Sequence, residues 1–189
     1  IEAIILPKTQ CFDFLATLAP MIDFKNKLVP LIETSRAIET VTQIAAFKDV
    51  VGLFFGAADA SASLGCKLAW EPLLYARHRV VLAASMFNLF TIDAPYFYID
   101  KMAGLKEEAE AVKNLGFTGK AAIHPDQIDH INEAFSPSPE EKAEAKKVLE
   151  EYQKSGGGAI KVDGQMIDEP IAEAMRLKIT LGEEEKGKK

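Results

Sequence analysis

Short runs of apolar and β-branched residues recur along the chain and predict buried parallel strands. They lie at residues 4–6, 28–32, 50–55, 91–93 and 120–123. Each run is followed by a segment whose apolar residues recur near the helical period. These segments predict helices at residues 11–18, 36–47, 72–87, 105–115 and 127–135. Repeated strand–helix units predict parallel pairing with right-handed crossovers.

Two architectures contain such units, an open doubly wound sheet and a closed eight-stranded barrel. No Gly-rich turn follows the first strand, as a nucleotide-binding doubly wound fold would require. Polar residues instead follow or end the strands, namely Lys8, Glu33, Asp59, Asp93 and His124. Functional groups at the C-terminal ends of several strands are typical of barrel enzymes. We therefore predict an α/β fold of the (β/α)8 TIM-barrel type, of which this chain supplies about five βα units.

A different pattern begins after residue 135. Ser138 is a helix cap, Pro139 suits the first helical position, and the helix should run to about Lys154. Residues 159–167 predict a hairpin that turns at Asp163–Gly164, and a last helix follows from about residue 170 to 179. We thus predict two parts, a partial barrel at 1–135 and an extension at 136–189. The extension could reach a neighbouring subunit, and its charged end (183–189) should be solvated.

Composition narrows the function classes. The chain is 48% hydrophobic and 26% charged, as expected of a globular protein, and its net charge of −6 argues against nucleic-acid or anionic-membrane binding. No apolar run approaches the roughly 18 residues of a membrane span. Cys11 and Cys66 fit neither a zinc nor a disulfide spacing, which predicts free thiols in the cytoplasm or an organelle matrix. Because the chain begins inside a predicted strand without Met, we expect the native N-terminus upstream of Ile1.

Glu33 and Asp59 end successive strands in apolar surroundings. Burying a carboxylate is costly unless it is paired or bound to a metal. Mg²⁺ prefers one or two carboxylates and leaves its other positions to water and substrate oxygens. The alternative is that each acid caps a helix or pairs with an arginine such as Arg36 or Arg77.

Other strand-end residues are weaker candidates. His124 precedes Pro125, which favours an extended backbone there, but a lone His is often structural. Lys8 could bind an anionic group. From position alone, Asp168 is a cap of the last helix and Asp93 a turn or cap residue.

Six segments in this order resemble the citrate lyase beta-subunit-like family of the HpcH/HpaI aldolase superfamily. They are ILPK (5–8), PLIET (30–34), GLFFGAAD (52–59), IDAPY (92–96), the block from GFTGK through IHP to AFSPSP (116–139), and DGQMID (163–168). The resemblance covers nearly the whole chain, and the long block is its most specific part.

The resemblance implies an α/β barrel that binds Mg²⁺ through the acids matching Glu33 and Asp59. It implies cleavage or formation of a carbon–carbon bond beside the thioester of a 3-hydroxyacyl-CoA such as citryl-, citramalyl- or malyl-CoA. The acid matching Asp168 would come from an adjacent subunit and act in proton transfer or thioester hydrolysis, which overrides the cap interpretation. CoA would run along the barrel mouth near Lys8 and the backbone of Ile123, His124 and Pro125. Relatives are usually trimeric, so we expect a homo-oligomer, a trimer or hexamer.

The chain also departs from the pattern. Relatives carry three further strands before the one at Ile4, with an acidic motif and an arginine that holds the substrate, and none of these is in this sequence. The chain should therefore correspond to the C-terminal units of the barrel. Two other functions stay open, an inactive half-barrel that serves as an assembly module and a pyruvate aldolase that acts without CoA.

Overall fold

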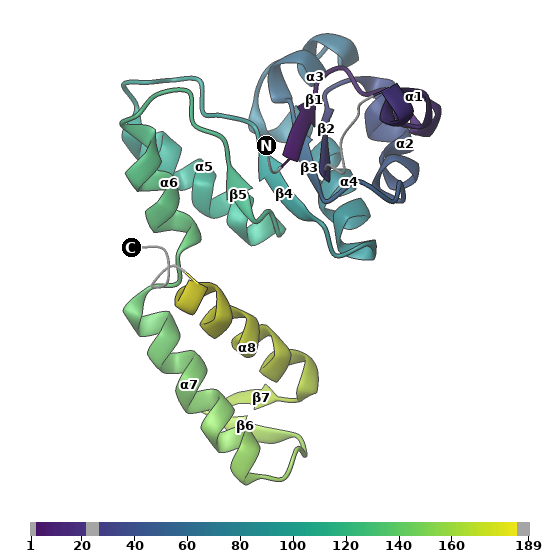
Figure 1. Ribbon diagram of the computed structural model, residues 1–189. Helices are drawn as coiled ribbons and strands as arrows, with labels where there is room; N and C mark the ends of the chain where they lie inside the picture. The colour runs from purple at the N-terminus through teal and green to yellow at the C-terminus, as the bar shows by residue number, and fades with distance from the viewer. Residues whose placement is uncertain (1–2, 22–26, 185–189) are drawn as a thin grey trace. The chain divides into compact units, whose positions relative to one another are not determined.

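The computed structural model describes residues 3–21 and 27–184, which form two compact units, Ile1–Ile131 and Asn132–Lys189 (Figure 1). The first unit carries the predicted strand–helix repeats, and the second carries the hairpin extension. The predicted solvated tail lies mostly outside the described residues. The boundary expected at residue 135 and the role given to each part stay predictions.

The first unit is built on a five-stranded parallel sheet whose strands follow one another in chain order. The strands are β1 (Ala3–Leu6), β2 (Lys27–Ile32), β3 (Gly52–Phe55), β4 (Phe90–Asp93) and β5 (Gly119–Lys120). This confirms the predicted α/β fold with parallel pairing.

Two predicted strands are longer than those observed. Val50 makes only an isolated bridge to Leu28, so β3 begins later, at Gly52. The last strand stops at Lys120 because the Ile123 N–H donates to the side chain of Gln127 and not to a neighbouring strand. The residues after β5 therefore leave the sheet and lead to α6, which begins at Gln127.

Each predicted helix of the first unit is present. The helices are α1 (Phe12–Leu18), the 3-10 turn η1 (Ala19–Met21), α2 (Ser35–Ala45), α3 (Ala57–Leu64), α4 (Trp70–Met86), α5 (Met102–Leu115) and α6 (Gln127–Phe135). Helix α3 was not predicted from the sequence. Its small residues show little helical period, and the helix is bounded by Gly56 and by Gly65, which ends it in the left-handed conformation (φ 65°).

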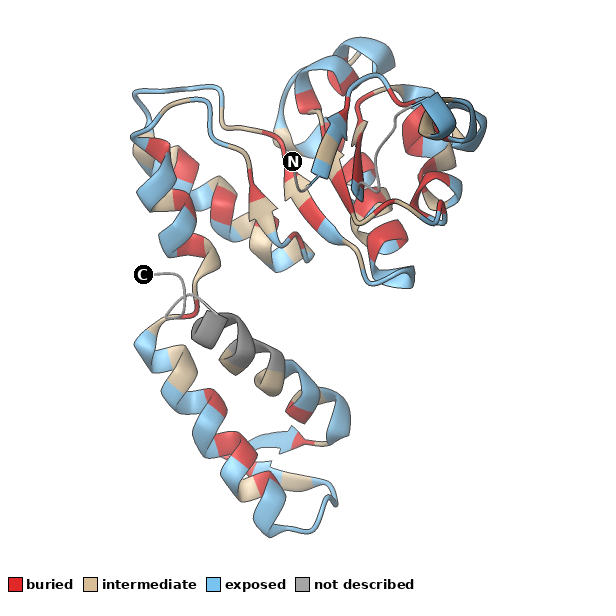
Figure 2. Ribbon diagram, in the orientation of Figure 1, coloured by how far each residue is buried: buried red, intermediate tan, exposed pale blue. Residues whose placement is uncertain are grey.

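The two faces of the sheet differ in burial. Partners in the strand register point to the same side, so Leu31, Phe54 and Ile92 share one face, where all three are half-buried. On the other face Ile32 and Phe55 are fully buried. Figure 2 shows red, buried stretches along the strands and pale blue on the outer sides of the helices. One face is thus packed like a domain core, while the other keeps part of its apolar surface accessible.

The second unit folds around its own small core. Helix α7 (Pro139–Lys154) begins with a capping box in which Ser138 and Glu141 bond each other's backbone N–H, as the sequence predicted for Ser138 and Pro139. The antiparallel strands β6 (Ile160–Val162) and β7 (Gln165–Ile167) turn at Asp163–Gly164, both with positive φ, which confirms the hairpin. Helix α8 (Glu169–Glu184) is longer than predicted. Apolar residues from α7, the hairpin and α8 form the core of this unit: Val148, Leu149, Tyr152, Val162, Ile167 and Ala172.

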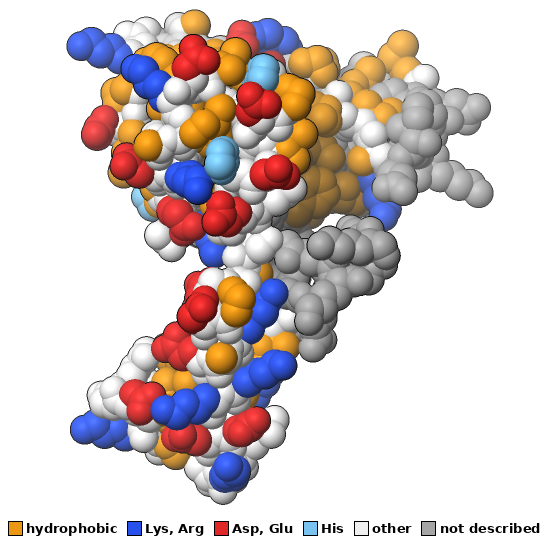
Figure 3. Space-filling model, turned by 90° about the vertical axis from the view of Figure 1, so that its left-hand side faces the viewer, with side chains coloured by type: hydrophobic (Ala, Val, Ile, Leu, Met, Phe, Trp, Pro, Cys, Tyr) orange, Lys and Arg blue, Asp and Glu red, His pale blue; other side chains and the backbone are white. Residues whose placement is uncertain are grey.

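The surface shown in Figure 3 intersperses acidic and basic side chains on both units, without a basic patch on that face. Both cysteines, Cys11 and Cys66, are free thiols, as predicted. Within the described residues, no helix has the length and apolar character that crossing a membrane would demand.

Candidate functional site

The turn after β1 holds Lys8 in an unusual backbone conformation. Its φ of 54° lies in the left-handed region, which residues other than Gly seldom occupy. Thr9 is fully buried, and its hydroxyl donates to the C=O of Leu6 at 3.0 Å, which closes the turn. Backbone strain of this kind persists only where surrounding contacts support it, and it clusters at functional sites. For Lys8 those contacts come from the next two strand ends.

Glu33 lies directly after β2 and is 3% exposed. The backbone N–H of Lys8 donates to its Oε1 atom at 2.7 Å, which compensates part of the cost of burying the carboxylate. The next residue, Thr34, caps α2 by accepting from the N–H of Ala37 at 3.1 Å. The strand therefore turns into the helix immediately after Glu33, which fixes the direction of the acid.

Gly56 leaves the room that Glu33 occupies. Its N–H donates to the C=O of Ile32 at 3.0 Å, which brings the backbone after β3 close to the end of β2. A Cβ atom at position 56 would lie 2.7 Å from the Glu33 Cβ and 2.9 Å from its Oε2. Any side chain at this position would force the carboxylate to move.

Asp59 completes the arrangement from the first turn of α3, where the helix dipole favours an acid, and its side chain is half exposed. The Lys8 Nζ donates to Asp59 Oδ1 and lies 3.8 Å from Glu33 Oε1. The hydrogen bond to Asp59 raises the pKa of Lys8, desolvation opposes that rise, and the charge of Glu33 adds to it. One cationic group, the Lys8 ammonium, thus contacts both carboxylates. The alternative of a salt bridge is therefore present with Lys8 as the basic partner, and Arg77, one of the two arginines considered for it, pairs with Asp93 instead.

A second group of charges lies at the end of β4 and was not recognised from the sequence. Asp93 is fully buried and accepts from Arg77 Nε and from Lys120 Nζ, each at 2.8 Å. Lys120 Nζ also donates to the C=O of Ala94 at 2.7 Å and to Glu108 Oε1 at 2.6 Å. Asp93 is therefore a buried ion-pair acceptor and not the turn or cap residue suggested by its position. The only available signal was an acid ending a strand that is otherwise apolar.

Gln127 links two loops at the C-terminal edge of the sheet. It is fully buried, accepts from the Ile123 N–H at 3.0 Å and donates to the C=O of Tyr96 at 2.9 Å. The C=O of His124 is also engaged, by the N–H of Gln127 at 3.1 Å. The His124 side chain is partly exposed, and its Nδ1 accepts from the Asp126 N–H at 3.3 Å. The Ile123 N–H and the His124 C=O, in the backbone expected to meet CoA, are thus bonded within the loop.

Replacing Gln127 by Leu should destabilise the first unit by about 1–3 kcal/mol, because the part-buried Ile123 N–H and Tyr96 C=O lose the partner that the buried Gln127 side chain supplies. Urea unfolding followed by the fluorescence of Trp70, the single tryptophan, measures the change. The exposed Gln43, changed to Leu, is the matched control and should leave stability nearly unchanged. Hydrogen exchange at the Ile123 amide should accelerate in Gln127→Leu only, and an unchanged rate would contradict this role.

Asp168 lies in the second unit, directly before α8, where its Oδ1 accepts from the Ile171 N–H at 3.4 Å. The bond is long, but its geometry is that of a helix cap. The structure therefore shows the local role that the sequence position suggested, and the role implied by the family resemblance stays a prediction. Glu33, Asp59 and Lys8 are brought together within the first unit.

Comparison with known protein families places this chain. The family model described as HpcH/HpaI aldolase/citrate lyase matches residues 1–125. The human mitochondrial citramalyl-CoA lyase is 33% identical to the chain, over 95% of this chain and 60% of that protein. A citrate lyase subunit beta-like protein of Mycobacterium tuberculosis is also 33% identical, over 89% of this chain and 62% of that protein. The chain thus spans about three fifths of the length of these relatives.

Solved structures that are similar to this chain include proteins of the same kind as these sequence relatives. The CitE protein of M. tuberculosis in complex with magnesium, acetoacetate and coenzyme A is 31% identical with a TM-score of 0.85, covering 96% of this chain and 68% of that one. RipC from Yersinia pestis is 40% identical with a TM-score of 0.71, covering 74% of this chain and 66% of that one. Sequence and fold point to the same group of proteins, and the chain belongs to the HpcH/HpaI aldolase/citrate lyase family.

Proposed function

We propose that this chain is part of a magnesium-dependent carbon–carbon lyase that cleaves or forms a 3-hydroxyacyl-CoA, such as citryl-, citramalyl- or malyl-CoA. The observation that carries the proposal is the joint contact of one cationic group, the Lys8 ammonium, with Glu33 and Asp59. A typical Mg²⁺ site in a protein has one or two carboxylate ligands, and here one cation can contact two carboxylates at once. Relatives named as lyases, and a CitE structure with magnesium and coenzyme A, support the assignment.

The residues present fit the ion. The space above Gly56 accommodates the Glu33 carboxylate, and the Lys8 N–H fixes its Oε1. Within the part of the chain that the structure describes, no group of three or more His, Cys, Asp or Glu side chains is arranged to hold a metal. A two-carboxylate site suits Mg²⁺, which keeps several positions for water and substrate, better than zinc, which takes three or four protein ligands.

In this proposal each residue has a distinct role. Glu33 is the rigid ligand because it is buried and held by a backbone N–H, whereas the half-exposed Asp59 can adjust to the substrate. A Mg²⁺ ion held by Glu33 and Asp59 would supply Lewis-acid stabilisation of negative charge on substrate oxygens. Asp168, contributed by an adjacent subunit of a homo-oligomer, would transfer a proton or assist thioester hydrolysis.

CoA recognition is proposed for the loop after β5 and for Lys8. A shallow hollow of about 220 Å³ is lined by Ala122, Ile123, His124, Pro125 and Ile128. Its mostly apolar side chains suit the uncharged arm of a CoA thioester. The Lys8 side chain is more than half exposed, so it could contact an anionic group of the same ligand.

We also propose that the five strands are the C-terminal part of an eight-stranded barrel. The half-buried face with Leu31, Phe54 and Ile92 would then be its interior. The share of each relative that this chain covers is consistent with that reading. Free thiols suit the cytoplasm or an organelle matrix as the location.

Calorimetric titration with Mg²⁺ tests the proposal directly. The chain should bind the ion, and Asp59→Asn should weaken binding by about tenfold or more, because one of two charged ligands is lost. Asp129→Asn makes the same change of charge at an exposed position outside the site. This control variant should bind Mg²⁺ as tightly as the parent protein. Absence of binding, also in a chain extended to the length of its relatives, would refute the metal site and favour an inactive assembly module.

In such an extended chain, release of acetyl-CoA from a panel of acyl-CoA thioesters reports the reaction. Turnover of free hydroxy-oxo acids without CoA would instead identify a pyruvate aldolase. Asp168→Asn should strongly reduce thioester turnover while Mg²⁺ affinity stays as in the parent. Unchanged turnover would rule out a catalytic role for Asp168.

Removing the Lys8 ammonium should strengthen Mg²⁺ binding. In Lys8→Met the backbone N–H to Glu33 is retained, but a positive charge no longer competes for both carboxylates. We expect an affinity gain of roughly three- to tenfold, because the repulsion between an exposed ammonium and the ion is partly screened by water. Lys48→Met, at an exposed lysine, is the matched control. Weaker binding in Lys8→Met would show that Lys8 supports the metal site instead of competing for it.

A further inference from the structure

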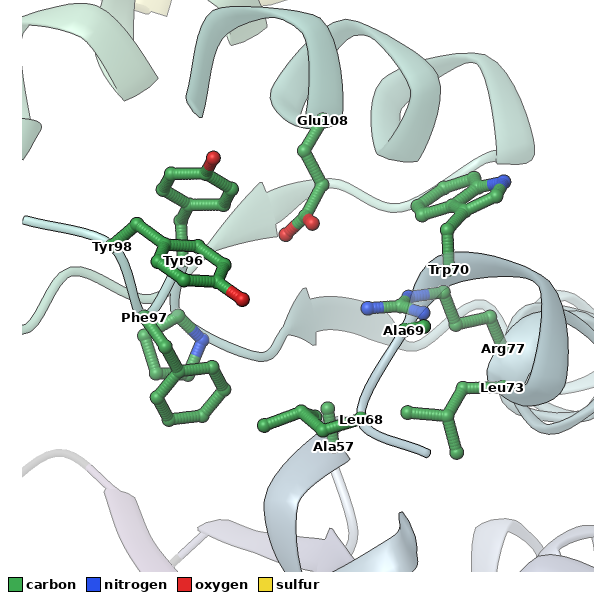
Figure 4. Close-up of a pocket in the computed structure, with 11 residues that line it drawn as sticks. Ala57, Leu68, Ala69, Trp70, Leu73, Arg77, Tyr96, Phe97, Tyr98 and Glu108 are labelled. Atoms are coloured by element: carbon green, nitrogen blue, oxygen red, sulfur yellow. The ribbon is translucent and has the colours of Figure 1, made fainter. Parts of the chain in front are cut away.

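An aromatic hollow of about 280 Å³ lies beside the start of α3 and is lined by residues of α4, α5 and the loop after β4 (Figure 4). Tyr96, Phe97 and Tyr98 form the side supplied by the loop, and Trp70 comes from α4. The rings of Tyr96 and Tyr98 are 5.6 Å apart at their centroids. This volume lies just below the range of about 300 to 1,000 Å³ that is usual for ligand pockets. It suits a single flat ring system.

The hollow contains a buried donor without a partner. Arg77 is 3% exposed and packs against the Trp70 ring, 4.7 Å from its centroid. Its Nε bonds Asp93, but its Nη1 has no hydrogen-bond partner among the described residues. Figure 4 shows the guanidinium directed into the hollow. Buried donors are nearly always bonded to protein, water or ligand, so this guanidinium, with a donor left unused, favours an acceptor in the hollow.

An acceptor enters the hollow from another side. The Glu108 carboxylate points into it from α5 (Figure 4), and only its Oε1 is engaged by Lys120. Burial, and next the charge of Glu108, raise the pKa of Tyr96, so this phenol stays neutral in the wall. Arg77, Asp93, Lys120 and Glu108 form a chain of alternating charges with two cations and two anions. Because these charges compensate one another, an ionic ligand would find no opposite charge in excess, whereas a neutral polar ring would find both a donor and an acceptor.

We propose that this hollow binds the adenine base of a nucleotide or nucleotide-containing ligand. Adenine is flat and uncharged, offers ring nitrogens as acceptors for the Arg77 guanidinium, and carries an amino group that can donate to Glu108. Trp70 and Tyr98 supply the apolar and stacking surface that bases favour in protein sites. The proposal involves neither Glu33 nor Asp59 and requires no metal, so it stands or fails separately from the proposed lyase function. The base could belong to a free nucleotide or to the adenine end of a CoA thioester.

Trp70 provides the readout, since it is the only tryptophan of the chain and lines the hollow. Adenosine, titrated without divalent ions, should quench its emission in a saturable way. Inosine, which replaces the amino group by an oxygen, should bind at least about tenfold more weakly because an acceptor would face Glu108. Equal binding of adenosine and inosine would overturn the proposal, as would the absence of saturable quenching.

Tyr98→Ala should weaken adenosine binding by about tenfold or more, since it removes one stacking surface. Tyr98 is 58% exposed, so the variant should fold, and circular dichroism checks this. Tyr75→Ala, at an exposed tyrosine on α4 outside the hollow, should bind like the parent. If the two variants bound adenosine equally, the assignment would be wrong. Displacement of adenosine by CoA would identify the thioester as the source of the base, and displacement by ATP alone a free nucleotide.

Discussion

Asp93→Asn should lower the free energy of unfolding of the first unit by about 3–5 kcal/mol, which is the usual cost of removing one partner from a buried ion pair. The variant keeps the size of the side chain and loses its charge. Lys120, which is 7% exposed, would keep Glu108 as a counter-charge, whereas Arg77, which is 3% exposed, would lose the carboxylate with which it pairs. An amide nitrogen would also face one of the two cations. Urea unfolding followed by Trp70 fluorescence should show a lower midpoint with a similar slope.

Asp126→Asn is the matched control for this change. Asp126 is exposed and lies 3.6 Å from His124 Nδ1, so its loss of charge should alter stability by less than about 1 kcal/mol. Similar losses in the two variants would mean that the network of Asp93 contributes no more than a surface pair. If Asp93→Asn were more stable than the parent, the desolvation penalty of these buried charges would exceed the stabilisation from their mutual attraction.

Glu33→Gln should weaken Mg²⁺ binding by about a hundredfold or more, because even residues behind the ligands change metal affinity by about 10–100-fold. The amide that replaces the carboxylate would keep an oxygen for the Lys8 N–H, so the turn should persist while the charged ligand is lost. Calorimetry measures the affinity, and a circular dichroism spectrum like that of the parent would show that the fold is retained. Stability should change little or increase, since a buried charge is removed.

Glu39→Gln controls for net charge. Glu39 is exposed on α2, six residues after Glu33, and its side chain has no part in the site. The Mg²⁺ affinity of Glu39→Gln should equal that of the parent protein. If Glu33→Gln also bound like the parent, the carboxylate pair would be a purely structural contact of Lys8, and the ion would have to bind elsewhere.

The repeat of strands and helices could be predicted because periodicity and burial report it directly. The acids at positions 33 and 59 became candidates because each follows an apolar segment, but it was the family resemblance that made them a predicted metal pair. The contact of Lys8 with both acids could not be predicted, since it depends on a left-handed backbone at one residue and on a register between three strands. The same holds for Gln127 and Lys120, whose partners lie 31 and 27 residues away in the sequence. Pattern analysis finds where a side chain sits along an element, but pairing across loops requires the folded geometry.

The order of the sheet has a consequence for biosynthesis. Each strand from β2 to β5 pairs with the strand that precedes it in the chain. During translation, the partner of every new strand has therefore already left the ribosome, and the sheet can grow at one edge without waiting for a later segment. The closing loops are also of moderate length, which limits the entropy lost at each addition. Assembly in the direction of synthesis would let each new strand pair with an edge that is already formed, and this would reduce the chance that nascent chains associate through unpaired strands.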